Sequence, residues 1–431
     1  MSIAAEKGDA ETWTNWSGRL ECRPERLEEP ESVDELAAAV ETSDAVRVAG
    51  SGHSFYELVP TDATLLSLCR LSGLTSVDEA SSRAELHAGT TIRDAGPLLE
   101  AAGLALANQG DIDCQALAGA VATGTHGTGR SLGCIASGVT DFELVTADGD
   151  VVSAADRPDL LQGGAVSLGA LGVFSKIEVQ AVPRYNLRER VWAEPIEDLL
   201  SRWETLAASH RHFEFFAFPF TGLAMAKTLD EEPWQAAESS GHAADSSGGT
   251  FAQLLELNRE NPQQARELFK GGLSNTRPTE DFGPSHRVFP SDRDDLFNEM
   301  EYAVPLERGP DCLRAVLRAI EEADLPVLFP IEFRTVAPDE LWLSPFYQRP
   351  SAVLAVHQYA AQECEPVFEV AEPVLREHEG RPHWGKIHTL GPEDLARLYP
   401  RWNDFLALRQ ELDPRGKFLN PALRKLFGVA A

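Results

Sequence analysis

A histidine framed by glycines and a lysine that follows an aromatic residue are the residues of this chain best suited to chemistry. The histidine stands in Gly50-Ser51-Gly52-His53-Ser54, and the lysine in His383-Trp384-Gly385-Lys386. Glycines let a backbone turn tightly and approach a ligand closely, and a fixed cation stabilises negative charge that develops on a bound group. His53 has two interpretations at this point, a ligand-bearing residue or a hydrogen-bonding turn residue.

A second stretch, between Asn108 and Gly129, is rich in small residues and hydroxyls. Its backbone N–H groups and threonine hydroxyls suit the phosphates of a nucleotide cofactor. The composition predicts a loop that contributes nothing to a core, and a glycine-rich turn without a ligand is the alternative. The first stretch lacks the third glycine of a dinucleotide Rossmann fingerprint. Two such stretches in one α/β region therefore favour FAD over a Rossmann-type NAD domain.

Glu332 and Arg334 alternate on a predicted strand, so their side chains should lie side by side on one face. A carboxylate and a guanidinium match vicinal hydroxyls, although without neighbouring motifs an ordinary surface ion pair would be the better interpretation. His357 is a candidate hydrogen-bond partner or proton acceptor, with a core histidine as the alternative. His383 and His388 are five residues apart, but no third ligand accompanies them at a suitable spacing, and no metal site is expected.

Local patterns predict that these residues stand on a fold of mixed helices and strands. Ser32 and Glu35 have capping-box spacing, which predicts that a helix starts there. The polar stretch from Asp230 to Gly249 is expected to be a surface segment, either a mobile insertion or a lid. The sequence also predicts strands at Val46–Ala49, Thr64–Leu68, Ala84–Ala88, Gly172–Val182 and His212–Phe220, helices at Ile92–Ala102 and Asp311–Ala323, and a hairpin turn at Ala147-Asp148-Gly149-Asp150.

Composition and charge narrow the class of protein. A chain of 431 residues is long enough for two domains. The formal net charge of -30 disfavours nucleic acid and anionic lipid as partners, and it indicates either solubility or a salt-rich habitat. No apolar run reaches membrane-spanning length, the first residues do not resemble a signal peptide, and the six cysteines lack CxxC pairs. We therefore expect a cytoplasmic protein with reduced thiols and no membrane insertion.

Five separated motifs together resemble the sugar-1,4-lactone and alditol oxidases of the vanillyl-alcohol oxidase superfamily. The resemblance extends from about Asn15 to Phe427, and it implies an α+β, two-domain flavoprotein. It implies an FAD-binding domain at residues 12–183, a substrate domain with an antiparallel sheet at 184–405, and a C-terminal segment at 406–431 that returns to the first domain. The motifs are Gly50–Ser54, Asn108–Gly129, Phe329–Arg334, Val356–Tyr359 and Arg381–Lys386, and the terminal segment matches at Asp413, Pro414, Gly416, Phe418 and Asn420.

The resemblance implies a cofactor, a reaction and a set of site residues. It implies FAD joined covalently through the ring of His53, and hydride transfer from a carbinol of a sugar lactone or polyol to flavin N5, with O2 as the acceptor. Glu332 and Arg334 would hold the substrate, and His357 and Lys386 would assist deprotonation and stabilise reduced flavin. The residues expected to contact the cofactor are Val48, Ala49, Gly50, Ser51, Gly52, His53, Ser54, Asp111, Ala116, Gly119, Thr123, Gly124, Thr125, His126, Gly127, Val173 and His383.

Three positions bear on the substrate and the electron acceptor. Alditol oxidases tend to carry a small alcohol side chain where this chain has Asp111, and Thr where it has Tyr359, so the resemblance favours the gulono- and arabinono-lactone branch over xylitol or sorbitol oxidases. Gly110 stands where relatives carry a residue linked to oxygen access, and a residue without a side chain favours an oxidase. A dehydrogenase with another acceptor and a non-catalytic flavin-binding protein are the alternatives, and the number of subunits stays open.

Overall fold

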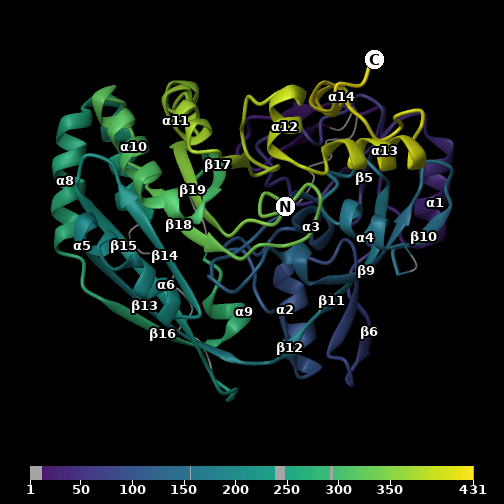
Figure 1. Ribbon diagram of the computed structural model, residues 1–431, viewed down its shortest axis with the longest axis horizontal. Helices are drawn as coiled ribbons and strands as arrows, with labels where there is room; N and C mark the ends of the chain where they lie inside the picture. Colours follow the sequence, from purple (N-terminus) through teal and green to yellow (C-terminus); the bar gives the residue numbers. More distant parts are fainter. Residues whose placement is uncertain (1–11, 156, 238–247, 292–294, 431) are drawn as a thin grey trace.

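Two lobes make up the described part of the protein. The computed structural model describes residues 12–155, 157–237, 248–291 and 295–430. In Figure 1 one lobe contains the first part of the chain and its yellow C-terminal end, and the other contains the teal and green middle part. Helices and sheets occur in both lobes, which confirms the predicted α+β class.

The first lobe begins with a parallel sheet that leads into the loop carrying His53. The strand order is β3-β5-β4, and helix α1 lies between β3 and β4 in the chain. The predicted start of α1 is confirmed, because Ser32 Oγ accepts a hydrogen bond from the N–H of Glu35 at 3.2 Å. The elements are β1 (Trp13–Thr14), β2 (Glu21–Cys22), β3 (Arg26–Glu28), α1 (Val33–Thr42), β4 (Val46–Ala49) and β5 (Thr64–Ser67).

A five-stranded antiparallel sheet, ordered β10-β9-β11-β7-β6, is the second large sheet of this lobe. The hairpin of β9 and β10 turns at the predicted Asp-Gly pair, where Gly149 has a φ of +83°. The predictions for β7, β11 and α2 are confirmed to within a few residues. The elements are β6 (Leu74–Asp78), β7 (Arg83–His87), α2 (Ile92–Ala101), β8 (Leu104–Ala105), α3 (Leu117–Thr123), β9 (Val139–Val145), β10 (Val151–Ser153), α4 (Pro158–Gly164), β11 (Val173–Gln180) and β12 (Val182–Pro183).

Helix α3 corrects one expectation about the stretch between Asn108 and Gly129. Part of this stretch is helical, and Leu117, Ala120 and Val121 are buried in the core of the lobe. The expectation that the stretch contributes nothing to a core was wrong, because residues this small can pack a helix closely against its neighbours. The other side of the helix still faces the cavity described below.

An eight-stranded antiparallel sheet, ordered β16-β13-β15-β14-β18-β19-β17-β20, is the basis of the second lobe. Helices α5, α6 and α8 pack against β13–β15, and α10 and α11 pack against β17–β19, on the side away from the first lobe (Figure 1). The predictions for β14 and α10 are confirmed. The elements are β13 (Asn186–Pro195), α5 (Ile196–Leu200), α6 (Trp203–Ser209), β14 (His212–Phe218), β15 (Leu223–Glu232), α7 (Gly248–Glu260), α8 (Pro262–Ser274), β16 (Thr279–Pro284), α9 (Ser285–Val288), β17 (Phe297–Pro305), α10 (Gly309–Glu322), β18 (Ile331–Val336), β19 (Ser351–Tyr359), α11 (Glu365–Glu377) and β20 (Arg381–Pro382).

The last part of the chain folds back onto the first lobe. Val46 N–H donates to Lys417 O at 2.9 Å, and Lys417 Nζ donates to Val40 O at 2.7 Å. Helices α12 (Pro392–Leu398), α13 (Trp402–Leu412) and α14 (Pro421–Phe427) lie over this lobe in yellow in Figure 1. The domain bounds after residues 183 and 405 stay predictions, and the second of them falls inside α13.

The polar stretch from Asp230 to Gly249 is described only at its two ends. Strand β15 continues to Glu232 and helix α7 begins at Gly248, while residues 238–247 lie outside the described residues. Within the described ranges, no helix is both long and apolar enough to cross a membrane.

A buried guanidinium connects several segments of the first lobe. Arg47 on β4 is 5% exposed, and it donates hydrogen bonds to four carbonyl oxygens at 2.6 to 3.1 Å. Burial lowers the pKa of Arg47 to about 10, so the side chain stays charged at neutral pH. The four carbonyls belong to Leu58, Leu168, Gly169 and Phe418, so this one charge holds the loop after β4, the approach to β11 and the C-terminal segment together.

We expect Arg47→Met to lower the free energy of unfolding by roughly 3 kcal/mol, because four buried carbonyl oxygens would lose their donor. Urea denaturation of the purified protein measures this change. Arg47→Lys keeps the charge and some of the donors, and it should lose less stability. An unchanged unfolding midpoint for Arg47→Met would contradict this account of the lobe.

Candidate active site

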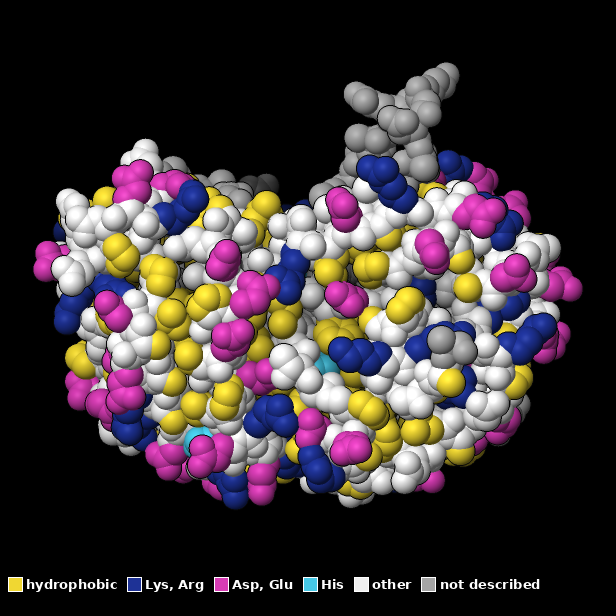
Figure 2. Space-filling model, turned by 90° about the horizontal axis from the view of Figure 1, so that it is seen from above, with side chains coloured by type: hydrophobic (Ala, Val, Ile, Leu, Met, Phe, Trp, Pro, Cys, Tyr) yellow, Lys and Arg dark blue, Asp and Glu magenta, His cyan; other side chains and the backbone are white. Residues whose placement is uncertain are grey.

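A cavity of about 860 Å³ lies between the two lobes, with residues of both in its wall. This volume is in the range of pockets that bind small molecules. The face shown in Figure 2 is hollowed between the lobes. The cavity brings together most of the predicted site residues: Val48, Ala49, Gly50, Ser51, Gly52, His53, Ser54, Asp111, Ala116, Gly119, Thr123, Thr125, His126, Val173, Glu332, Arg334, His357, His383 and Lys386.

Gly124 and Gly127 are the two predicted cofactor residues that do not line this cavity. Gly124 ends helix α3 with a φ of +72°, a conformation that favours glycine. A Cβ at Gly127 would lie 2.1 Å from the carbonyl oxygen of Gln109. The structure therefore explains both glycines by backbone geometry and packing.

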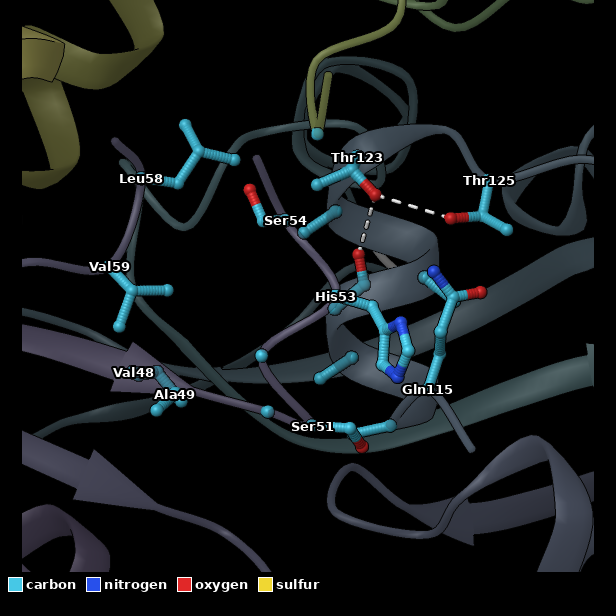
Figure 3. A pocket seen from close by; sticks show the side chains of 18 of the residues that line it. Val48, Ala49, Ser51, His53, Ser54, Leu58, Val59, Gln115, Thr123 and Thr125 are labelled. Carbon is cyan, nitrogen blue, oxygen red and sulfur yellow. Dashed lines mark hydrogen bonds between the residues drawn. The ribbon is translucent and has the colours of Figure 1, made fainter. Parts of the chain in front are cut away.

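The loop after β4 presents the His53 side chain to the cavity (Figure 3). Gly52 makes the turn with a φ of +74°, and the indole of Trp16 stacks on the imidazole with ring centroids 4.9 Å apart. Burial, and secondarily the charge of Lys386, lower the pKa of His53 to about 4. The ring is therefore neutral at physiological pH, and one of its nitrogens carries a lone pair.

Strand β18 places Glu332 and Arg334 side by side, as predicted, with Arg334 Nε 3.4 Å from Glu332 Oε1. Arg334 Nη2 also binds Glu301 Oε2 at 2.6 Å across the sheet. Burial raises the pKa of Glu332 to about 7 against the opposing charge of Arg334. Burial acts in the same direction on Glu301, but Arg334 and then His126 hold the pKa of Glu301 well below its ordinary value.

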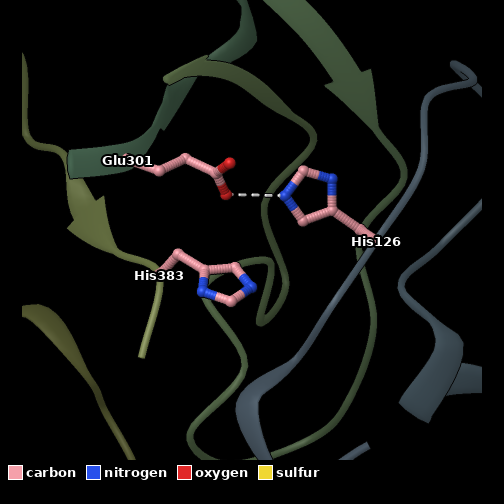
Figure 4. Close-up of side chains that lie close together, drawn as sticks. All are labelled: His126, Glu301 and His383. Atoms are coloured by element: carbon pink, nitrogen blue, oxygen red, sulfur yellow. Dashed lines mark hydrogen bonds and ion pairs between the residues drawn. The ribbon is translucent and has the colours of Figure 1, made fainter. Parts of the chain in front are cut away.

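His126, Glu301 and His383 form a buried cluster (Figure 4). His126 Nδ1 lies 2.8 Å from Gly127 O and Nε2 lies 2.9 Å from Glu301 Oε1. Each ring nitrogen of His126 thus faces an oxygen atom. Burial lowers the pKa of His383 to about 3, so this second ring is neutral.

The same cluster has the composition of a metal site, because its ligand atoms lie within 4.8 Å of one another. The two oxygens of Glu301 already bind His126 and Arg334. An ion would have to displace a guanidinium and carry its own positive charge into the same space. These contacts argue against a metal ion in the cluster, and the expectation of no metal stays a prediction.

Strand β17 contributes a carboxylate that connects two predicted catalytic residues. Lys386 Nζ binds Glu299 Oε2, and His357 Nε2 lies 3.6 Å from Glu299 Oε1. His357 Nδ1 lies 3.0 Å from Pro330 O, so Nδ1 is the donor. When the ring is neutral, its lone pair is on Nε2, and this nitrogen can then accept a proton.

Asp111 is held by the second lobe. Lys227 Nζ on β15 lies 3.3 to 3.4 Å from carboxylate oxygens of Asp111, Glu189 and Glu214. Ser291 Oγ donates to Asp111 Oδ2 at 2.8 Å. Burial raises the pKa of Glu214 to about 7 against the charge of Lys227. Asp111 thus lines the cavity and also takes part in an ion network beside it.

Sequence reasoning missed Glu299, Glu301, Lys227 and Trp16. One signal could have found the glutamates, since Phe297-Asn298-Glu299-Met300-Glu301-Tyr302 places acidic residues inside an apolar strand. Buried carboxylates need a partner or a function. Lys227 and Trp16 have no comparable local signal, because their partners lie far away in the sequence.

The wall of the first lobe fits FAD. A Cβ at Gly50 would lie 3.3 Å from the Cβ of Ala116, so the two glycine-containing stretches approach each other closely. A Cβ at Gly119 on α3 would have no atom within 4 Å and would project into the cavity. Hydroxyls of Thr123 and Thr125 lie 3.3 Å apart on the same wall (Figure 3). Small side chains, hydroxyls and open space are what a bulky phosphate-bearing cofactor requires.

Comparison with known proteins agrees with this description. Residues 24–155 match the family of FAD binding domains, and residues 177–426 match D-arabinono-1,4-lactone oxidase. L-gulono-1,4-lactone dehydrogenase of Mycobacterium tuberculosis is 35% identical over 96% of this chain and 99% of its own length. Alditol oxidase of a Streptomyces species is 33% identical over 96% and 98%. Mouse L-gulonolactone oxidase is 29% identical over 96% and 97%.

Solved structures show the same fold. Crystalline cholesterol oxidase from B. sterolicum superposes with a TM-score of 0.82 over 96% of both chains, at 17% identity. The family matches and these relatives identify an FAD-dependent oxidoreductase. The chain belongs to the D-arabinono-1,4-lactone oxidase family.

We expect Gly119→Leu to fold but to bind less FAD, because the added side chain would enter the cavity without meeting the core. The ratio of flavin to protein absorbance in the purified protein measures binding, and far-UV circular dichroism checks the fold. Gly271→Leu is the matched control, since Gly271 also lies in a helix with open space around its missing Cβ. Equal flavin content in the two variants would show that the bound cofactor does not lie against α3.

Proposed function

We propose that this enzyme oxidises a carbinol of a sugar 1,4-lactone of the gulono- or arabinono-lactone type and passes the electrons to O2, forming H2O2. The observation that supports this most is the shared cavity, in which Glu332, Arg334, His357 and Lys386 face the FAD-fitting wall of the first lobe. Bound FAD would supply the hydride acceptor at flavin N5. The names of the relatives support the lactone as substrate.

Glu332 and Arg334 would hold adjacent hydroxyls of the sugar. Arg334 is anchored on Glu301 at 2.6 Å, so its orientation is fixed before a substrate arrives. An ionised Glu332 accepts hydrogen bonds from hydroxyls, while Arg334 donates to their oxygens. Held in this way, one C–H bond would point at the cofactor.

His357 would take the hydroxyl proton as the C–H bond breaks. Its Nδ1 is engaged by Pro330 O, which orients Nε2 as the acceptor. Lys386, paired with Glu299, would stabilise the negative charge that reduction places on the cofactor. The two residues share one carboxylate, so proton transfer and charge stabilisation would be coupled.

Two features of the wall near the cofactor bear on substrate and acceptor. Asp111, held by Lys227 and Ser291, would replace a small alcohol side chain and favour a lactone over a linear polyol. Gly110 lines the cavity, where a Cβ would lie 3.3 Å from Thr125 Cγ2, and its lack of a side chain would favour O2 as the acceptor. Because one relative is named a dehydrogenase, a non-oxygen acceptor is the second candidate, and the alditol oxidase relative keeps polyols as the third.

We further propose that FAD is attached covalently through His53, whose neutral ring faces the cavity. A covalent bond would keep the cofactor bound and raise its reduction potential.

All six cysteines are unpaired thiols, which supports a reducing compartment, the cytoplasm.

Peroxide assays in air test the main proposal. We expect L-gulono- and D-arabinono-1,4-lactone to reduce the flavin and to yield H2O2, with little product from xylitol or sorbitol. Activity on polyols alone would make the enzyme an alditol oxidase. Reduced enzyme that is inert to O2 but reoxidised rapidly by a quinone or a cytochrome would make it a dehydrogenase. Flavin that none of these compounds reduces anaerobically would indicate a non-catalytic protein.

The raised pKa of Glu332, about 7, predicts a pH dependence. Below that pH the carboxyl is protonated, so kcat/KM should rise as the pH increases through about 7 and the acceptor forms. Glu332→Gln should remove this rise and lower kcat/KM at pH 8 between about 10-fold and 100-fold, the value of a hydrogen bond to a charged group. Glu214→Gln is the control, because Glu214 has a similarly raised pKa but pairs with Lys227. Loss of the rise in Glu214→Gln alone would assign the titration to the network around Lys227.

A further inference from the structure

One ring nitrogen of His53 is already engaged by the protein itself. Cys114 Sγ lies 3.0 Å from His53 Nε2, although the two residues are 61 positions apart in the chain. The thiol belongs to the stretch that leads into α3, and the imidazole belongs to the loop after β4. The contact therefore joins the two glycine-containing stretches that form the cofactor wall.

The stretch around Cys114 is fixed firmly enough to orient a ring. Ser51 Oγ donates to the carbonyl oxygen of Cys114 from the His53 loop itself. On the other side, the N–H groups of Ile92 and Arg93 at the start of α2 donate to Gln115 O and Asp113 O at 2.9 and 2.8 Å. The residues on both sides of Cys114 are thus held by backbone hydrogen bonds.

Trp16 restricts the ring from a second direction. Its indole stacks on the imidazole with an interplanar angle of 26°. Stacking opposes a flip of the ring about its Cβ–Cγ bond, because that rotation would turn the ring plane away from the indole, and the contact with Cys114 then engages Nε2. Nδ1 is the ring nitrogen that the thiol leaves unengaged.

We propose that Cys114 is a positioning residue for cofactor attachment, which engages His53 Nε2 and thereby directs Nδ1 to the 8α carbon of the flavin. This inference rests on the proposed covalent attachment through His53. In the tautomer that donates Nε2–H to the sulfur, the lone pair is on Nδ1, where the new bond forms. The imidazole N–H and one methyl C–H are lost, their two hydrogens and the bonding electrons reduce the flavin, and O2 then takes them as H2O2.

The surroundings of Cys114 favour positioning over a bond from the sulfur itself. Burial, and secondarily the charge of Asp113, raise the pKa of the Cys114 thiol. A neutral thiol is a poor nucleophile, but its sulfur still accepts a weak hydrogen bond.

The test uses the purified holoenzyme, Cys114→Ala and Cys114→Ser, with Cys22→Ala, a half-buried thiol in β2, as a control. Acid-precipitated protein is assayed for retained flavin fluorescence, and mass spectrometry of digested protein locates the flavin. We expect flavin on His53 in the wild type and in Cys22→Ala. Cys114→Ala should bind FAD but retain a covalent fraction about tenfold lower, because the ring loses its fixed orientation. Cys114→Ser, which keeps a polar atom there, should retain more than Cys114→Ala.

The wild type supplies a second, independent measurement. NMR of the isolated flavin peptide should show the bond at Nδ1, and a bond at Nε2 would overturn the proposal. Full attachment in Cys114→Ala, or flavin on Cys114 itself, would also overturn the positioning role of Cys114. Either result would still show that the flavin is bound covalently to the protein. A wild type whose flavin is released entirely by acid would instead refute the proposed attachment, and with it the function of Cys114.

Discussion

The cost of burying carboxylates determines how this site is built. Six of them, Asp111, Glu189, Glu214, Glu299, Glu301 and Glu332, lie buried in or beside the cavity between the lobes. An ionised carboxylate that loses water without gaining a partner costs several kcal/mol, so each must be paired or stay protonated. Arg334, Lys227 and Lys386 pair several of them, and the pKa values of about 7 for Glu332 and Glu214 show where this compensation is incomplete.

These pairs also fix one lobe against the other. His126 in the first lobe binds Glu301 in the second, and Asp111 in the first lobe contacts Lys227 in the second. Thr128 Oγ1 adds a hydrogen bond to Phe213 O at 2.6 Å across the same boundary. The wall that fits FAD and the wall that carries Glu332 and Arg334 are therefore set in position by the same interactions. A substitution that breaks one pair should change the distance between cofactor and substrate as well as the local charge.

The sequence could predict local structure and the residues that come with a recognisable motif. The cap at Ser32, the hairpin at Asp148 and Gly149, and the adjacent placement of Glu332 and Arg334 depend on neighbours a few positions away. The strand order of the large sheet was beyond such reasoning, because β18 pairs with β14 and β19 through long connections. The sequence also could not show which residues pair with each charged side chain. The contacts of Lys227 and Cys114 can be recognised only in the folded chain, which places Asp111 beside Lys227 and His53 beside Cys114.

Under the proposed function, substrate recognition and the choice of electron acceptor would depend on different parts of this cavity. Glu332, Arg334 and His357 stand on the sheet of the second lobe, whereas Gly110 and the glycine-containing stretches belong to the first. Residues that orient a sugar can therefore be kept while the path of O2 to the cofactor opens or closes. This separation would explain why relatives that match almost the whole of this chain include both named oxidases and a named dehydrogenase. In the proposed function the acceptor is therefore set by the wall of the first lobe, where a side chain at Gly110 would press against Thr125.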